Sequence, residues 1–346
     1  MQHPDFFDVL AFSALTIHSL KVLTMSKSQQ TPQSAPLSKS LFGSDNNPSN
    51  IMPAKLTADS TLKFRCHPGV SCFTNCCGNI NIILTPYDIL RIRRPLNLTA
   101  DEFLLRFTTP VYLEKTDLPG VKIHLDENGR CPFVTEEGCT IYPYRPTTCR
   151  YYPVGMSYFH AAGNEGTAAE EFYFLVKEPY CKGHEEPKEQ TIREWRIDQG
   201  IDESDEMNRE WMEIVMRRKS FGLQATLSEP AQKMFFMAST DLDKFRDFVF
   251  NSSFLETYDV DEETLAQIKT DDIALMKFSC KYLASSIFGT KDLVIKADKV
   301  KERAEQLKAN QGEAEKQAME TYEALRRDHE LLKKKIETQK QAGKKE

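Results

Sequence analysis

Eight of the nine cysteines in this 346-residue chain lie between Cys66 and Cys181, and only Cys280 stands apart. Cysteines that serve only as small core residues would be spread more evenly, so the clustering indicates a role that the thiols share. The clustered residues are Cys66, Cys72, Cys76 and Cys77, then Cys131, Cys139 and Cys149, and finally Cys181. The fold is therefore expected to bring distant stretches of chain together around sulfur atoms.

Clustered cysteines are also typical of secreted, disulfide-bonded proteins, but that class requires a signal peptide. The N-terminal stretch MQHPDFF has no basic region, the apolar segment 6–23 is interrupted by Asp8, His18 and Lys21, and no small-residue cleavage site follows. The same segment is too polar for a membrane span. We therefore expect a cytoplasmic protein with reduced thiols and no membrane partner. Its net charge of −6 predicts no nucleic-acid partner.

Thiolates bind Zn²⁺ at about 2.3 Å, four of them complete a tetrahedral shell, and iron–sulfur clusters also favour four cysteines. The sequence therefore predicts zinc or iron as the cofactor, an iron–sulfur cluster included. Eight thiols can form two four-ligand sites, or one site with the other thiols structural. Adjacent Cys76 and Cys77 are not expected to bind the same ion. The predicted metal ligands are Cys66, Cys72, Cys76, Cys77, Cys131, Cys139, Cys149 and Cys181.

Neighbouring residues suit this chemistry, although other roles for the thiols stay open. Arg145 and Arg150 flank Cys149 and are placed to balance the negative charge of thiolates. His184 is the best histidine candidate for a mixed Cys/His site, while Asp88 is expected to begin a helix rather than to bind metal. The alternatives to metal binding are reduced structural thiols and extracytoplasmic disulfides.

Local patterns predict short, broken strands in the cysteine-rich stretch. Residues 79–84 alternate as a strand does, and residues 110–134 are typical of short strands with turns at Pro119-Gly120 and Asn128-Gly129. The segment from Cys131 to Cys139 is expected to form a hairpin with a thiol at each end. Elements this short rarely form a core alone, so metal cross-links would explain how the stretch folds.

Helix-start signals are clearer than the strand signals. Thr85 can cap a helix, Pro86 suits its first position, and Asp88 lies at the capping-box position. Thr99 begins a second short helix in the same way. From Thr191 onward the apolar pattern becomes helical, and the positions expected in its core are Ile192, Trp195, Ile197, Trp211, Ile214 and Val215. Cys280, later in this region, is predicted to be a buried structural thiol.

These patterns predict an α+β protein: a small cysteine-rich, metal-stapled module of short strands and helices, an α-helical region and a long charged C-terminal helix. Residues 1–58 are predicted to be disordered, and 1–24 are either an upstream stretch before a true start at Met25 or a short amphipathic helix. The metal-binding domain is 59–186, the helical region is 187–296 and the charged tail is 297–346. A weak heptad seam in the tail indicates either a solvated helix or a coiled coil that binds a protein partner or a second copy of the chain.

Two blocks of the sequence resemble the YkgJ-type cysteine-cluster family. The first runs from Cys66 to Cys77 and on through Leu84-Thr85-Pro86-Tyr87-Asp88, and the second is Cys131-Pro-Phe-Val through Cys139-Thr-Ile-Tyr142 to Arg145-Pro146-Thr-Thr-Cys149-Arg150. The resemblance covers about residues 62–184. The family is described as a zinc- or iron-chelating domain, and the resemblance implies that Cys66, Cys72, Cys76, Cys77, Cys131, Cys139 and Cys149 carry the metal.

The sequence thus predicts a metal-chelating protein, and it leaves open whether the protein is an enzyme. The chain contains no GxGxxG, GxxxxGK[ST], HExxH or GxSxG motif, and no catalytic residues can be picked out. Some larger proteins that bear the domain resemble flagellin lysine methylases. The alternative function is therefore an iron-dependent enzyme with a protein lysine methylase-like or redox activity.

Overall fold

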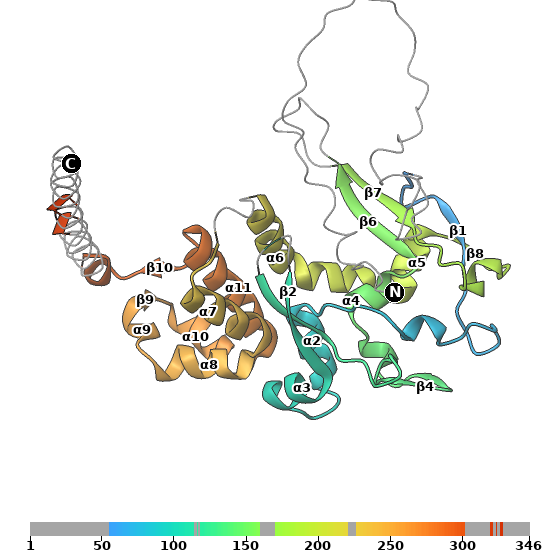
Figure 1. Ribbon diagram of the computed structural model, residues 1–346, viewed down its shortest axis with the longest axis horizontal. Coiled ribbons are helices and arrows are strands. Elements are labelled where there is room, and N and C mark those ends of the chain that lie inside the picture. The colour runs from blue at the N-terminus through green and yellow to red at the C-terminus, as the bar shows by residue number, and fades with distance from the viewer. Residues whose placement is uncertain are drawn as a thin grey trace, which may run out of the picture. The chain divides into compact units, whose positions relative to one another are not determined.

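The computed structural model describes residues 55–113, 116, 118–159, 170–220 and 226–301, together with 319–320, 323 and 326–327. Within these ranges the protein is α+β, as predicted, and its strands pair into two-stranded antiparallel sheets (Figure 1). The predicted disordered segment 1–58 lies almost wholly outside the described residues. So does most of the charged tail, although residues 297–301 begin a helix as expected.

The cysteine-rich stretch alternates short strands, 3-10 turns (η) and short helices. Its elements are β1 (Thr61–Lys63), η1 (Asn75–Cys77), α2 (Pro86–Arg93), α3 (Ala100–Phe107), β2 (Thr108–Leu113), β3 (Leu118–Ile123), β4 (Val134–Thr135), β5 (Gly138–Cys139), η2 (Tyr142–Tyr144), α4 (Thr147–Tyr151), β6 (Val154–Phe159), β7 (Glu170–Leu175) and η3 (Lys182–Glu185). The remaining elements are mostly helical: β8 (Glu189–Thr191), α5 (Ile192–Gln199), α6 (Ile201–Ser220), α7 (Glu229–Thr240), α8 (Leu242–Asn251), α9 (Phe254–Thr257), β9 (Tyr258–Asp259), α10 (Glu262–Thr270), α11 (Asp272–Phe288) and β10 (Val294–Ile295).

The chain divides into two compact units. The first takes in the described residues up to Phe250 together with Asp261–Asp292, and it contains all nine cysteines. The second takes in Asn251–Val260 and the described residues from Leu293. In this second unit β9 pairs antiparallel with β10, and Lys296 Nζ donates to the carbonyl of Leu255 at 2.7 Å.

The predicted helix starts at Thr85 and Thr99 are confirmed. The Thr85 hydroxyl accepts the backbone N–H of Asp88 at 3.1 Å, and the Asp88 carboxylate accepts the backbone N–H of Thr85 at 3.1 Å. Thr99 and Glu102 form the same reciprocal pair at the start of α3. These capping boxes satisfy backbone donors that the first turn leaves unpaired, so each short helix begins at the residue that its sequence specifies.

Two strand predictions are wrong in detail. Residues 79–84 form no regular strand: Asn79 is in the left-handed region (φ 53°), and the segment meets β3 through one isolated bridge, Ile83 to Lys122. Pro119-Gly120 is not a turn but lies inside β3, where Pro119 pairs with Tyr112. Both strands of a two-stranded sheet are edge strands, and edge strands can contain proline. The Pro-Gly dipeptide therefore did not indicate a turn here. The predicted turn at Asn128-Gly129 is confirmed, with Gly129 at φ 72°.

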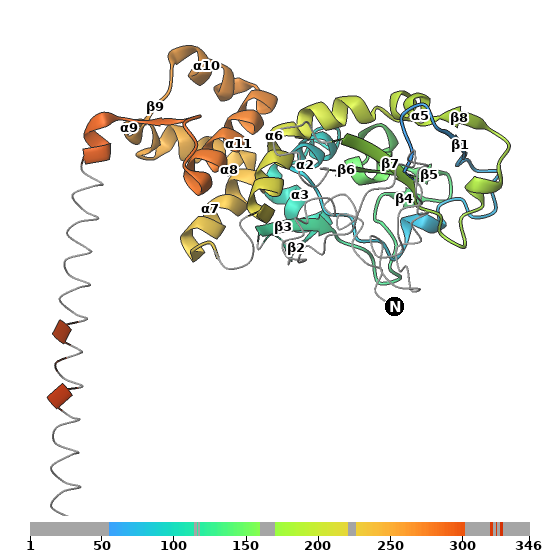
Figure 2. The ribbon, with the colours of Figure 1, turned by 90° about the horizontal axis from the view of Figure 1, so that it is seen from above.

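Two apolar clusters of the described residues lie beside the cysteines. One core contains residues of β1, of α5 and of the end of α4. In it, Phe64 packs edge-on against Trp195 with 5.4 Å between the ring centroids. The other is built on α2, α3 and β3 and includes Ile82 and Phe133. Figures 1 and 2 show β1, β8 and α5 together, and α2 and α3 together beside β2 and β3. Cys181 belongs to the first core, whereas Cys131, Cys139 and Cys149 pack against the second.

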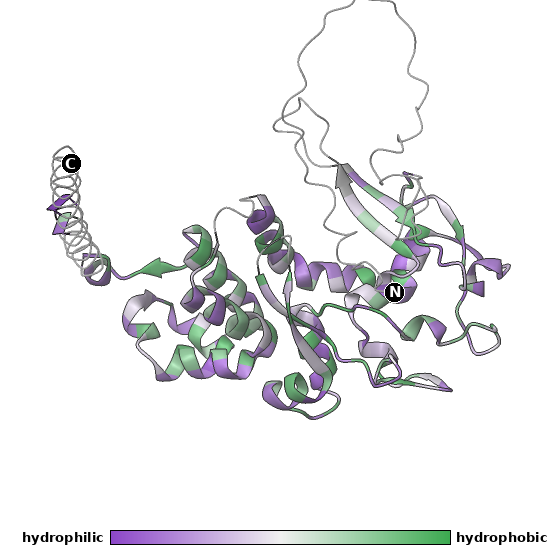
Figure 3. Ribbon diagram, viewed as in Figure 1, coloured by the Kyte–Doolittle hydropathy of each residue, from purple (hydrophilic) through white to green (hydrophobic). Residues whose placement is uncertain are grey.

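The helical region is amphipathic, with one correction to the predicted core. Figure 3 shows hydrophilic and hydrophobic stretches alternating along α6 and α8. Trp211, Ile214 and Val215 are buried as predicted, and so is Cys280. Ile197, however, is 67% exposed, because the last turn of α5 presents it away from the face that buries Ile192 and Trp195. No helix in the described ranges is long and apolar enough to cross a membrane.

A network of ion pairs joins the helical region to the cysteine-rich stretch. Asp272 lies in the first turn of α11 and forms ion pairs with Arg94 at 3.2 Å and Arg93 at 3.5 Å. It also accepts a hydrogen bond from Arg246. Arg93 also makes two hydrogen bonds to Asp243, at 3.0 and 3.2 Å. The start of α11 and the start of α8 are therefore held against the end of α2 by charge.

Candidate metal centre

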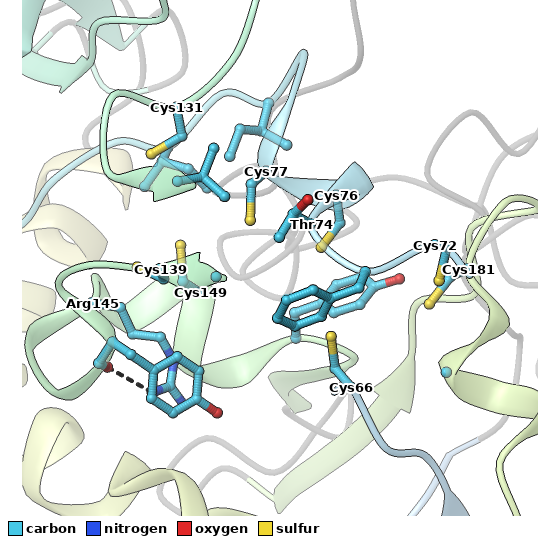
Figure 4. Close-up of a pocket in the computed structure, with 18 of the residues that line it drawn as sticks. Cys66, Cys72, Thr74, Cys76, Cys77, Cys131, Cys139, Arg145, Cys149 and Cys181 are labelled. Carbon is cyan, nitrogen blue, oxygen red and sulfur yellow. Dashed lines mark hydrogen bonds between the residues drawn. The ribbon is translucent and has the colours of Figure 1, made fainter. Parts of the chain in front are cut away.

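The eight clustered cysteines line one cavity and lie in two groups of four (Figure 4). We call them the Cys66 group (Cys66, Cys72, Cys76, Cys181) and the Cys139 group (Cys77, Cys131, Cys139, Cys149). Each group is electrostatically linked within itself. Burial raises the pKa of Cys66 to about 12, and Cys76, Cys181 and Cys72 add to this rise. All nine cysteines of the chain are free thiols, so none is joined in a disulfide.

Cys76 and Cys77 lie where the two groups meet. Their thiols hydrogen-bond each other, which lowers the pKa of Cys76 to about 7 and raises that of Cys77. Cys77 also feels the charges of Cys149 and Cys131, whereas Cys76 interacts with Cys66. The two neighbours thus face different groups.

The elements that carry the Cys139 group are tied to one another by backbone hydrogen bonds. The amide of Cys131 donates to the carbonyl of Cys77 at 2.8 Å, which joins η1 to the segment before β4. β4 and β5 form the predicted hairpin, with Cys139 paired opposite Val134. Cys149 lies in α4, which follows the hairpin after η2. Stretches more than fifty residues apart therefore meet at this group.

Backbone N–H groups lie against sulfur atoms of both thiol groups. The amide of Lys182 lies 3.1 Å from Cys72 Sγ. At three other cysteines the donor is the amide two residues later, and each bond lowers the pKa of its thiol against the rise that burial causes: Phe133 to Cys131, Ile141 to Cys139 and Gly183 to Cys181. A neutral thiol gains little from such donors, whereas a thiolate is stabilised by them. The local backbone is therefore shaped for ionised sulfur.

Cations face the Cys139 group. Burial and the thiols of Cys131 and Cys139 raise the pKa of Cys149, and the charge of Arg145 opposes that rise. Arg145 is itself held by the carbonyl of Tyr142 at 2.8 Å and by the side chain of Gln199. Arg150 does not serve the thiols as expected. Its guanidinium donates to backbone carbonyls, including that of Gln199 at 2.7 Å, and so fixes α4 to the end of α5.

The expected helix-start role of Asp88 is confirmed, and the structure adds a second one. The carboxylate is buried and is not among the residues that line the cavity. Its Oδ1 accepts the backbone N–H of Thr147 at 2.8 Å and the Thr147 hydroxyl at 2.7 Å. Asn208 also donates to that hydroxyl, at 3.1 Å. Thr147 and Asn208 could not be found from sequence, because polar residues 59 and 61 positions apart carry no local signal of pairing.

The cavity has a volume of about 500 Å³ and a mostly apolar wall drawn from both cores. Three of the residues that line it carry buried oxygen atoms without a hydrogen-bond partner: Asn81 Oδ1, Thr148 Oγ1 and Tyr152 Oη. Burial raises the pKa of Tyr152, and its hydroxyl lies against Cys181. Unsatisfied buried oxygen atoms are costly, so their presence in the lining of the cavity favours a bound group that they would contact.

The donor chemistry of this site fits zinc or iron, and the thiols surround the cavity without converging on a point. Among the residues that the structure describes, no three or more His, Cys, Asp or Glu side chains are arranged so that they could hold a metal ion. Binding therefore requires the four thiols of a group to turn toward one centre. His184 is not part of either group: it hydrogen-bonds the carbonyl of Val176 at 3.2 Å and packs on Phe64.

Comparison with known proteins identifies the same stretch. Residues 65–182 match a family described as "CxxCxxCC: Putative zinc- or iron-chelating domain". The match spans the segment from just before Cys66 to just after Cys181 and so includes both thiol groups. No curated protein and no solved structure matches the chain.

Proposed function

Since residues 65–182 match a family of zinc- or iron-chelating domains, we propose that they bind metal through the two four-thiol groups. Each group supplies the four sulfur ligands that a tetrahedral zinc site or an iron–sulfur cluster takes. The free thiols require a reducing compartment, so the proposal includes the cytoplasm as the location.

One observation carries the proposal most directly: backbone N–H groups lie against sulfur atoms of both thiol groups, among them the amide of Lys182 at 3.1 Å from Cys72 Sγ. Donors of this kind, together with Arg145, compensate the negative charge that four thiolates bring to a divalent ion. An apolar structural thiol has no need of them. When bound, the metal would replace the thiol protons and cross-link stretches that the short strands alone hold weakly.

The test is the metal content of the full chain after anaerobic purification, with an absorption spectrum of the same sample. Two ions per chain in colourless protein would establish two zinc sites. A brown protein with iron and acid-labile sulfide would establish a cluster. The Cys280→Ala variant is the matched control, because this thiol lies in α11 away from the cavity and its loss should leave the metal content unchanged. A full chain that retains no zinc or iron and takes up neither would contradict the proposal.

The cavity favours a second candidate, an iron-dependent enzyme with a redox or protein lysine methylase-like activity. Its volume of about 500 Å³ exceeds what metal ions need and falls in the range of small-ligand sites. The buried hydroxyl of Tyr152 would then contact a bound substrate as well as Cys181. Colourless protein with stoichiometric zinc and no iron would rule out this candidate.

A further inference from the structure

We infer that the two thiol groups differ in lability: the Cys66 group forms an exchangeable metal site, and the Cys139 group forms a permanent one. This inference rests on the proposed function. It adds which of the two thiol groups exchanges its metal with the solution. Anchoring and exposure support it.

The two groups are anchored differently. In the Cys139 group, Cys131, Cys139 and Cys149 pack against the core around Phe133 and belong to, or directly precede, a hairpin and a helix. In the Cys66 group, Cys66 and Cys72 lie between β1 and η1, in a stretch without helix or strand. Moving a ligand of the Cys139 group away from its metal would disturb the core, whereas a turn can shift at lower cost.

The charge around the two groups also differs. Arg145 faces Cys139 and Cys149 and Arg130 faces Cys131, while the carboxylates of Asp88 and Asp126 oppose the two arginines at Cys149 and Cys131. The Cys66 group instead meets the neutral hydroxyls of Tyr152 and Tyr180. Lys182 interacts electrostatically with Cys72, and it is solvent-exposed and pairs with Glu185 at 2.8 Å. The two groups therefore differ in the charges around them, but anchoring and exposure are what distinguish their lability.

Solvent exposure indicates which thiol would leave the metal first. Cys66 is the exposed member among the nine cysteines by residue surface, although desolvation of its sulfur still raises its pKa, and the four residues of the Cys139 group are all partly buried. Cys66 would be the ligand that solvent or a competing chelator reaches first, while Cys181 would stay in its core. Closed coordination is typical of structural metal sites, and an open position is typical of reactive ones.

Zinc release to a chromogenic chelator tests the inference. The full chain is loaded with two equivalents of Zn²⁺ and mixed with excess 4-(2-pyridylazo)resorcinol, and release is followed by absorbance. We expect two phases of one ion each, with rates that differ by about tenfold or more. Cys66→Ser should remove the fast phase and keep the slow one, and Cys280→Ala should keep both. Circular dichroism before release checks that each variant is folded.

Two results would overturn the inference while leaving the proposed function intact. One is release of both ions at a single rate from the unaltered chain. The other is loss of the slow ion in the folded Cys66→Ser variant. A chain that takes up no zinc at all would instead contradict the proposed function, and with it the inference.

Discussion

The carboxylate of Asp88 joins the starts of two helices: it closes the capping box of α2 with Thr85, and its Oδ1 accepts the backbone N–H of Thr147 at 2.8 Å. Thr147 is the first residue of α4, two positions before Cys149. One buried side chain therefore sets where a proposed metal ligand lies relative to α2.

The Asp88→Asn variant should lose stability and metal affinity together. The amide nitrogen cannot accept a hydrogen bond, so either Thr85 or Thr147 loses its partner in a buried position. We expect a loss of about 2 kcal/mol in the free energy of unfolding of the metal-free protein. Urea denaturation measures this loss, and zinc titration should show weaker binding to the Cys139 group.

The control for this variant is Glu102→Gln, which weakens the exposed capping box of α3 in the same chemical way. It should change stability far less and leave zinc affinity unchanged, because Glu102 has no link to α4. Equal effects of the two variants would show that Asp88 acts only as a local cap.

Removing a ligand should cost metal and stability together. Cys131→Ser and Cys149→Ser should each lose one ion per chain and lower Tm by more than about 5 °C, because ligation and folding are coupled. Metal analysis and thermal unfolding of the same samples measure both effects. Unchanged metal content and Tm in both variants would show that these residues are not ligands.

Arg145 is expected to act on the thiolates through its charge. Arg145→Gln removes that charge beside Cys139 and Cys149 and should weaken zinc binding by about tenfold. Arg145→Lys keeps the charge but loses the planar geometry that binds Tyr142 and Gln199. Competitive zinc titration should therefore rank the lysine variant between the parent and the glutamine variant. Equal affinity of the two variants would point to a purely structural role.

The ion pairs of Asp272 should make stability depend on pH. Burial raises the pKa of this carboxyl, but the hydrogen bond from Arg246 and the charges of Arg246, Arg93 and Arg94 outweigh burial and hold it below its usual value. A lowered folded-state pKa gives stability that is complete above the unfolded value near 4 and is lost as pH falls through the folded value. Asp272→Asn should cost about 1–2 kcal/mol at pH 7, after allowance for solvent screening, and progressively less below about pH 4.

Asp271→Asn is the matched control for that experiment. It removes a charge from the same helix start but keeps a side chain that can still cap Ile273 and Ala274. Its unfolding free energy should stay close to that of the parent at every pH. The parent and Asp272→Asn should differ less in unfolding free energy as the pH falls. A difference that stays constant in acid would show that ion pairs of Asp272 are not its cause.

Much of the local structure could be predicted because its causes are local. Thr85 with Asp88 and Thr99 with Glu102 are three residues apart, and each pair determines a helix start whatever the rest of the chain does. The strand predictions were less accurate, because pairing depends on a partner elsewhere. Residues 79–84 meet β3 at one bridge, and Pro119 lies on a sheet edge that no local pattern reveals.

The sequence by itself determined the chemistry of this protein: eight thiols in one stretch, helices that begin at their caps, and a resemblance to a chelating family. Only the tertiary structure decided how those thiols divide, with Cys76 facing one group and Cys77 the other. The division depends on two separate cores and on Asp88 meeting Thr147 across 59 positions. Contacts at that separation arise from packing of the whole unit, which spacing along the chain does not encode.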